Sequence, residues 1–221
     1  MTESLPSPHV AAIIPAFNEA TQIGLVLQVL RQIPDLDQII LVDDGSTDST
    51  LSVMQAASQT DPRIQVIHND TNRGKGEAVY SARQEVQAQY LLLVDADLLG
   101  LQPHHVLDLM RPVLTSQADM TVGIFKGGKL NTDFSHFITP WISGQRFLQA
   151  RLLDQINWRA ASGYGLESAI TIAARKQGWR CRYIPWRGVY HPPSEFHRGI
   201  WKGTINRVRM YSHILRAWLS S

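Results

Sequence analysis

The chain has 221 residues, of which 44% are hydrophobic and 18% charged, a composition that fits one globular α/β domain and excludes a disordered chain. The net charge is +2, yet ten of the 21 basic residues and one of the 19 acidic residues lie in 175–221. This asymmetry indicates that the C-terminal part meets something anionic: phosphates, an anionic membrane, nucleic acid or the acidic remainder of the chain.

The cysteine content, the apolar segments and the N-terminal sequence together indicate the compartment in which the protein is expected. The single cysteine, Cys181, excludes an internal disulfide framework and suits a reducing compartment. No segment approaches the ~20 apolar residues of a spanning helix, and the N-terminus has no signal-peptide pattern. We therefore expect a cytoplasmic protein, either free or peripheral on the cytoplasmic face of a membrane.

Strand and helix patterns alternate through the first 125 residues. Predicted strands cover 10–16, 38–44, 64–69, 90–97 and 118–125. Predicted helices cover 19–33, 74–88 and 103–114, and one more, with Ser46 or Thr47 as its N-cap, runs to about Ala57. This alternation predicts an α/β fold with a mostly parallel central sheet and helices on both faces.

The pattern changes after Phe125. Residues 126–147 mix glycine, proline and aromatic residues without a clear period, and we expect a functional loop that leads into a helix. A helix at 165–178 and late strands at 179–186 and 188–191 follow.

Polar clusters follow three of the predicted strands, at 15–19, 43–48 and 95–97. In open α/β sheets, ligands bind beyond the carboxyl ends of the strands. We therefore expect these three loops to meet along one rim of the sheet and to form one site.

Two aspartates, Asp95 and Asp97, end the apolar run that forms the fourth strand. Adjacent carboxylates repel unless a proton, an arginine or a divalent cation lies between them. A Mg²⁺ or Mn²⁺ ion shared with a diphosphate suits this chemistry, and the competing interpretation is a helix N-cap or a solvated turn. His191 is either a structural histidine or a third ligand, which would favour manganese.

Four other polar residues are candidates for binding or catalysis. Asp44 can accept a base N–H or a ribose hydroxyl, or serve only in turn chemistry. Lys75, between two glycines at a helix start, can meet phosphate. Glu167 is either a general base or the cap of its own helix, and Arg187 can pair with a phosphate.

The segment 197–219 interleaves basic residues with apolar ones such as Trp201 and Trp218 at helical spacing. It fits an amphipathic helix on anionic lipid, or a helix packed on the domain with its basic face in solvent. No nucleic-acid recognition motif accompanies the basic residues, so we expect no nucleic-acid partner.

Five segments, IIPAFNEA, LVDDGSTDST, NRGKGEAV, LLLVDADL and ASGYGLESAI, resemble in order and spacing the family 2 glycosyltransferases of GT-A fold. The resemblance covers roughly residues 10–191. It implies a nucleotide sugar across the first two loops and a divalent metal on its diphosphate. The segments DADLL and GYGLE with the late histidine look like the branch of the glucosyl-3-phosphoglycerate synthases. The polyprenyl-phosphate sugar transferases form the other similar branch.

The resemblance also implies site residues. Glu167 and Lys75 would be catalytic: Lys75 stabilises the leaving diphosphate, and Glu167 acts as a base in an inverting enzyme or positions the acceptor in a retaining one. The metal ligands would be Asp95, Asp97 and His191. The residues on the nucleotide sugar would be Pro15, Ala16, Asn18, Glu19, Asp44, Lys75, Asp95, Ala96 and Arg187.

We therefore expect one domain over 1–221, with a nucleotide-sugar-binding half at 1–125, an acceptor-side half at 126–196 and a basic amphipathic helix at 197–221. The expected enzyme moves a hexose from a UDP-sugar, or else a GDP-sugar, to a phosphate-bearing or lipid acceptor, with Mg²⁺ or Mn²⁺ as cofactor. A homodimer is compatible with this expectation. The alternative is a non-catalytic membrane- or sugar-binding module on a degenerate GT-A fold.

Overall fold

The computed structural model describes residues 9–126, 143–161 and 165–192. Its strands are β1 (Val10–Ala16), β2 (Gln38–Asp44), β3 (Ile64–Asn69), β4 (Tyr90–Leu93), β5 (Met120–Lys126), β6 (Arg146–Gln149) and β7 (Cys181–Arg187). Its helices are α1 (Ile23–Leu30), α2 (Thr50–Ser58), α3 (Lys75–Glu85), α4 (Pro103–Leu114), α6 (Ala150–Leu153), α7 (Trp158–Ala161) and α8 (Leu166–Lys176).

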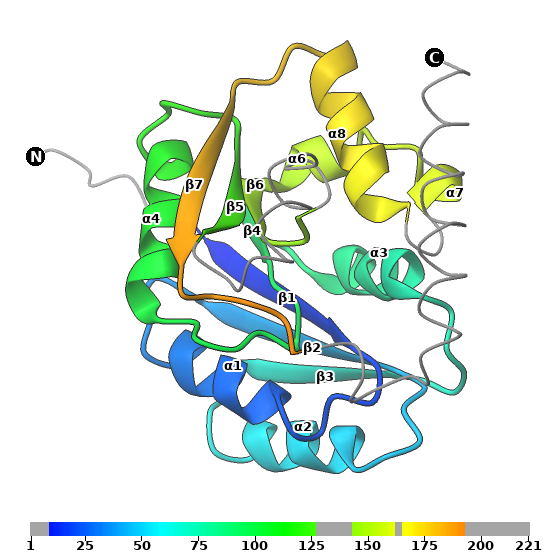
Figure 1. The fold of residues 1–221 in the computed structure, drawn as a ribbon. Coiled ribbons are helices and arrows are strands. Elements are labelled where there is room, and N and C mark those ends of the chain that lie inside the picture. Colours follow the sequence, from blue (N-terminus) through cyan, green and yellow to red (C-terminus); the bar gives the residue numbers. More distant parts are fainter. Residues whose placement is uncertain (1–8, 127–142, 162–164, 193–221) are drawn as a thin grey trace, which may run out of the picture.

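The strands form one seven-stranded sheet in the order β3-β2-β1-β4-β6-β5-β7 (Figure 1). Strands β1 to β4 pair in parallel, and β5 pairs in parallel with β7. Only β6 runs in the opposite direction, between β4 and β5. The predicted α/β class with a mostly parallel sheet is confirmed.

Helices cover both faces of the sheet, and each face has its own apolar core. Ala12 and Ile14 of β1 lie in one cluster with side chains of α1 and α4. Ala11 and Ile13, which alternate with them, lie in the other cluster with side chains of α3 and α8. Because successive side chains of a strand point to opposite faces, a strand that is covered on both sides is a continuous apolar run.

The same rule explains the central strand β4. Leu91 and Leu93 lie in one core and Leu92 and Val94 in the other, and all four side chains are buried. Full burial of one such side chain stabilises the fold by roughly 1.5–3 kcal/mol. The apolar run therefore holds β4 in the centre of the sheet, and the residues that follow emerge at its rim.

Three local predictions were wrong or incomplete. The N-cap of α2 is Ser49, because Ser46 and Thr47 instead form hydrogen bonds with the loop after β1. Residues 146–149 form β6 where the end of a loop leading into a helix was expected, since four residues are too few to show a period. The expected strand at 188–191 is reduced to a single bridge between Tyr190 and Leu99.

Some predictions fall outside the described residues. These are the loop at 127–142, the glycine turn at 162–164 and the basic helix at 197–219, all of which stay predictions. Among the described helices, none has the length and apolar character needed to cross a membrane.

Candidate active site

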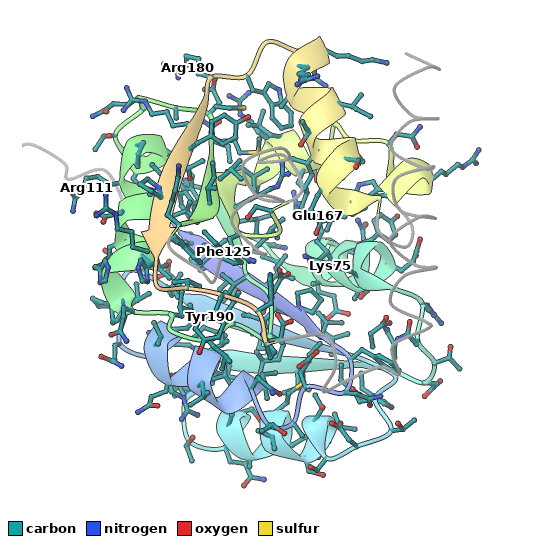
Figure 2. The ribbon with its side chains drawn as sticks, viewed as in Figure 1. Lys75, Arg111, Phe125, Glu167, Arg180 and Tyr190 are labelled. Atoms are coloured by element: carbon teal, nitrogen blue, oxygen red, sulfur yellow. The ribbon has the colours of Figure 1, made fainter. Side chains whose placement is uncertain are left out.

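One ammonium group joins three distant parts of the chain at the rim of the sheet. Lys75 Nζ, at the start of α3, donates to the carboxylate of Asp95 just after β4. It also donates to Glu167 Oε1, at the start of α8, over 2.6 Å. Figure 2 shows Lys75 and Glu167 between these two helices. The structure thus brings together two residues predicted as catalytic and one predicted as a metal ligand.

This three-residue cluster is mostly buried, and its charges stabilise one another. Burial by itself lowers the pKa of Lys75, but Asp95 and Glu167 outweigh burial and raise that pKa above its ordinary value. Burial likewise raises the pKa of Asp95, but Lys75, His191 and the hydrogen bond from Gln145 together outweigh burial and lower that pKa. Lys75 and Asp95 therefore remain an ion pair at neutral pH.

A second polar pair lies beside the first. His191 Nδ1 and Asp97 Oδ1 are 2.8 Å apart, and His191 Nε2 lies 3.8 Å from Asp95 Oδ2. Burial lowers the pKa of His191, but the hydrogen bond to Asp97 and the negative charges of Asp97 and Asp95 together outweigh burial, and the pKa is raised. Asp95, Asp97 and His191 each offer one ligand atom, and these atoms lie within 4.8 Å of one another. The three predicted metal ligands therefore converge.

A backbone bridge brings His191 to the aspartates. The amide of Leu99 donates to the carbonyl of Tyr190 over 3.0 Å, and the amide of Tyr190 donates back over 3.1 Å. The two segments approach closely because Gly100, at φ +74°, has no Cβ that would collide with the carbonyl oxygen of Gly188. This bridge joins the loop after β4 to the segment after β7 and fixes the histidine next to Asp97.

The chemistry of these residues fits a divalent cation. Glu19 adds a fourth carboxylate, and its Oε2 is buried without a hydrogen-bond partner among the described residues. Burial, with the nearby negative charge of Asp97, raises the pKa of Glu19 to about 7. Carboxylates therefore outnumber the single ammonium of Lys75 here, and two carboxylates with an imidazole suit Mn²⁺ or Mg²⁺.

Asn18 ties the first two predicted nucleotide loops together. It adopts φ 58°, and its backbone amide donates to Ser46 Oγ over 3.0 Å. Its side-chain oxygen accepts the amide hydrogen of Thr47 over 2.8 Å. The backbone amide of the next residue, Glu19, donates to Thr50 Oγ1 over 2.8 Å. The loops after β1 and β2 thus form one rigid edge beside the carboxylates.

Asp44 positions the loop that precedes Lys75. Its buried carboxylate accepts the backbone amides of Arg73 and Gly74, the latter over 2.7 Å, and the side-chain amide of Asn69 over 3.0 Å. Both carboxylate oxygens of Asp44 therefore already accept hydrogen bonds from groups of the protein. A contact between Asp44 and a nucleotide base stays a prediction.

The remaining predicted residues differ in their positions. Pro15 and Ala16 end β1 at the rim, in register with the end of β2. The side chain of Ala96 is buried in the core, so only its backbone is at the rim. Arg187 is exposed at the end of β7, and its contact with a phosphate stays a prediction.

Sequence analysis missed two residues that contact the cluster directly. Gln145 is fully buried and forms two hydrogen bonds with Asp95. Gly144 packs so closely that a Cβ there would lie 2.7 Å from both carboxylate oxygens of Asp95. Both residues lie about 50 positions from Asp95 in the sequence, and no motif marks them.

Solved structures share this fold. Glucosyl-3-phosphoglycerate synthase from Mycobacterium tuberculosis, in complex with Mn²⁺, UDP-glucose and phosphoglyceric acid, matches with a TM-score of 0.75 and 20% identity. The match covers 95% of this chain and 79% of that chain. The same synthase with Mg²⁺ and UDP matches with a TM-score of 0.69 and 21% identity over 84% and 72% of the two chains. At these identities the likeness establishes the GT-A fold alone.

Sequence comparison establishes the family. Residues 11–167 match the model of glycosyl transferase family 2, and the chain therefore belongs to that family. It is 28% identical over 201 residues to the undecaprenyl-phosphate mannosyltransferase of Micrococcus luteus, and the alignment covers 80% of this chain and 82% of the relative. It is 30% identical over 126 residues to the glucosyl-3-phosphoglycerate synthase of Mycolicibacterium paratuberculosis, covering 55% of this chain and 38% of the relative. The prediction of a glycosyltransferase enzyme is confirmed.

Proposed function

We propose that the protein transfers a hexose from a nucleotide sugar, preferably a UDP-sugar, to a phosphate-bearing or lipid acceptor with the aid of Mn²⁺ or Mg²⁺. The observation that carries this proposal is the convergence of Asp95, Asp97 and His191 beside Lys75 at the carboxyl end of the sheet. Two comparisons support it: the synthase with the same fold was solved with Mn²⁺ and UDP-glucose, and one relative is an undecaprenyl-phosphate mannosyltransferase.

The donor side of the site is formed by residues 1–125, and His191 joins it from the segment after β7. Asp95, Asp97 and His191 would hold the cation, which when bound would neutralise charge on the donor diphosphate. Lys75 adds a fixed positive charge at the same rim, where it stabilises the diphosphate as negative charge develops during departure. The rigid edge formed by Asn18 and its partners, together with Glu19, faces the nucleoside.

The acceptor side lies in residues 126–196. Glu167 is its central group, because it lies in the first turn of α8 and forms an ion pair with Lys75, which also pairs with Asp95. If transfer inverts the anomeric centre, Glu167 removes the proton from the acceptor oxygen. If transfer retains it, Glu167 orients the acceptor. The anomeric configuration of the product, read by NMR, decides between these roles.

Calorimetric titration tests the donor. UDP, UDP-glucose and GDP-mannose are titrated into the protein, each with Mn²⁺ and with chelator. We expect metal-dependent binding of UDP and UDP-glucose, whereas preference for GDP-mannose would name the other donor class. Binding of none by the folded protein would overturn the proposal and favour a non-catalytic module.

A matched pair of variants controls this titration. Asp97→Asn keeps the size of the side chain and removes a charged ligand, and we expect it to abolish the metal-dependent part of binding. Asp70→Asn makes the same change on a side chain that is 99% exposed, and we expect no effect.

Two acceptor classes are then compared. Radiolabelled UDP-glucose is supplied with phosphoglyceric acid or with a polyprenyl phosphate in detergent, and the labelled product is identified. We also expect anionic liposomes to sediment the intact chain and not a chain that ends before residue 197. Absence of sedimentation would remove the proposed membrane contact without affecting the proposed reaction.

A further inference from the structure

Gln145 holds Asp95 at two points. Its Nε2 donates to Asp95 Oδ2 over 2.7 Å, and its Oε1 accepts the backbone amide hydrogen of Asp95 over 3.1 Å. A side-chain amide suits this double contact because it offers one donor and one acceptor in a plane. The contact therefore fixes both the backbone and the carboxylate of the same residue.

The two oxygens of Asp95 face different partners as a result. Oδ1 accepts from Lys75, whereas Oδ2, held by Gln145, lies 3.8 Å from His191 Nε2. If the carboxylate rotated, it would lose the hydrogen bond to Gln145 and the ion pair with Lys75 together. Gln145 is also neutral, so it orients Asp95 without a positive charge that would compete with a cation.

Gln145 is itself held rigidly. The side chain of Gln145 is fully buried, and its backbone carbonyl oxygen accepts the backbone amide hydrogen of Gly123 in β5 over 2.8 Å. The following residue, Arg146, is also buried, and its guanidinium donates to Thr171 Oγ1 of α8 over 3.1 Å. The segment is thus fixed to both β5 and α8, and Gln145 cannot follow Asp95 if that side chain turns.

We infer that Gln145 is a positioning residue of the donor site, which holds the Asp95 carboxylate between Lys75 and the Asp97–His191 pair. Both side-chain hydrogen bonds that Gln145 forms within the described residues go to Asp95. The consequence for nucleotide binding rests on the proposed function.

The test uses Gln145→Met, which keeps the length and volume of the side chain and removes both hydrogen bonds. Loss of a hydrogen bond to a charged group weakens an equilibrium by about ten- to a hundredfold. We expect the Kd for UDP in Mn²⁺, measured by calorimetry, to rise by that factor. Gln149→Met makes the same change at the other end of β6, where Gln149 accepts from Arg151, and should leave the Kd unchanged.

A second measurement does not depend on the ligand. In a crystal structure of unliganded Gln145→Met, we expect the Asp95 carboxylate to leave its position between Lys75 and His191. An unchanged Asp95 orientation would overturn the inference. If Gln145→Met does not fold, Gln145→Asn serves instead, because its shorter amide cannot reach both atoms of Asp95.

The outcomes separate the inference from the proposed function. If the wild type binds UDP with Mn²⁺ and Gln145→Met binds it equally well, the inference fails and the proposed function stands. If the wild type binds no nucleotide, the proposed function fails, and the orientation of Asp95 in the crystal still decides whether Gln145 positions it.

Discussion

Adding one methyl group at Gly144 should disable the donor site without unfolding the protein. A Cβ at this position would lie 2.7 Å from both carboxylate oxygens of Asp95, and nearer still to Lys75 Nζ. Ordinary van der Waals contact begins at 3.4 Å, so the Asp95 oxygens must withdraw by about 0.7 Å. Such a shift stretches the ion pair between Lys75 and Asp95. Lys75 also binds Glu167, and Asp95 also binds Gln145, so these contacts are disturbed as well.

The expected magnitude follows from the contacts that are lost. One hydrogen bond between charged groups contributes about 1.5–3 kcal/mol, which corresponds to a ten- to hundredfold fall in kcat/KM for the donor. The free energy of unfolding should fall by no more than about 1–2 kcal/mol, because the atoms that must move are side-chain ends and not backbone. Initial rates at varied UDP-sugar and urea unfolding measure the two quantities.

Gly24→Ala is the matched control. Gly24 lies within α1, and a Cβ there meets no atom within 4 Å. The substitution should raise the free energy of unfolding by about 0.5–1 kcal/mol, through helix propensity, and leave kcat/KM unchanged. Wild-type kcat/KM in Gly144→Ala would refute the argument that the ion pair needs its present geometry. Loss of folding in Gly144→Ala would show that the backbone yields before the ion pair does.

Three further changes test other parts of the site. Asp97→Ala should abolish metal-dependent nucleotide binding with little change in Tm, and retained metal dependence would remove Asp97 from the ligand set. Gly100→Ala should lower the free energy of unfolding by about 1–3 kcal/mol and weaken Mn²⁺ binding, because a Cβ at φ +74° meets the carbonyl of Gly188 and displaces His191. Burial and the neighbouring aspartates, Asp97 foremost, raise the pKa of Glu19 from 4.5 to about 7, so the folded state binds this proton more tightly than the unfolded state does. Stability from this group is therefore complete below pH 4.5 and is lost as the pH rises through 7. In chelator, the free energy of unfolding of Glu19→Gln should therefore rise relative to that of the wild type by about 1 kcal/mol between pH 5 and pH 8, a figure that allows for solvent screening. The measurement is urea unfolding across this pH range, and a constant difference between the two proteins would contradict the argument.

The sequence by itself determined the central fold and the positions of the carboxylates. The apolar run before Asp95 is buried on both faces, which is the pattern of a central parallel strand, and such a strand must end at the ligand-binding rim. For the same reason, the aspartates at the end of β2 and the loop around Asn18 could be placed at that rim in advance. These are local signals, because a few consecutive residues contain all the information.

Tertiary structure decided how the polar side chains pair. Lys75 meets Glu167 across 92 positions and Gln145 meets Asp95 across 50, and no period or motif connects members of either pair. Strand β6 places Gln145 there because it inserts antiparallel between β4 and β5. His191 reaches Asp97 only through the bridge at Leu99, which depends on how two loops pack. Such contacts follow from long-range packing of the whole sheet, and short-range periodicity does not encode them.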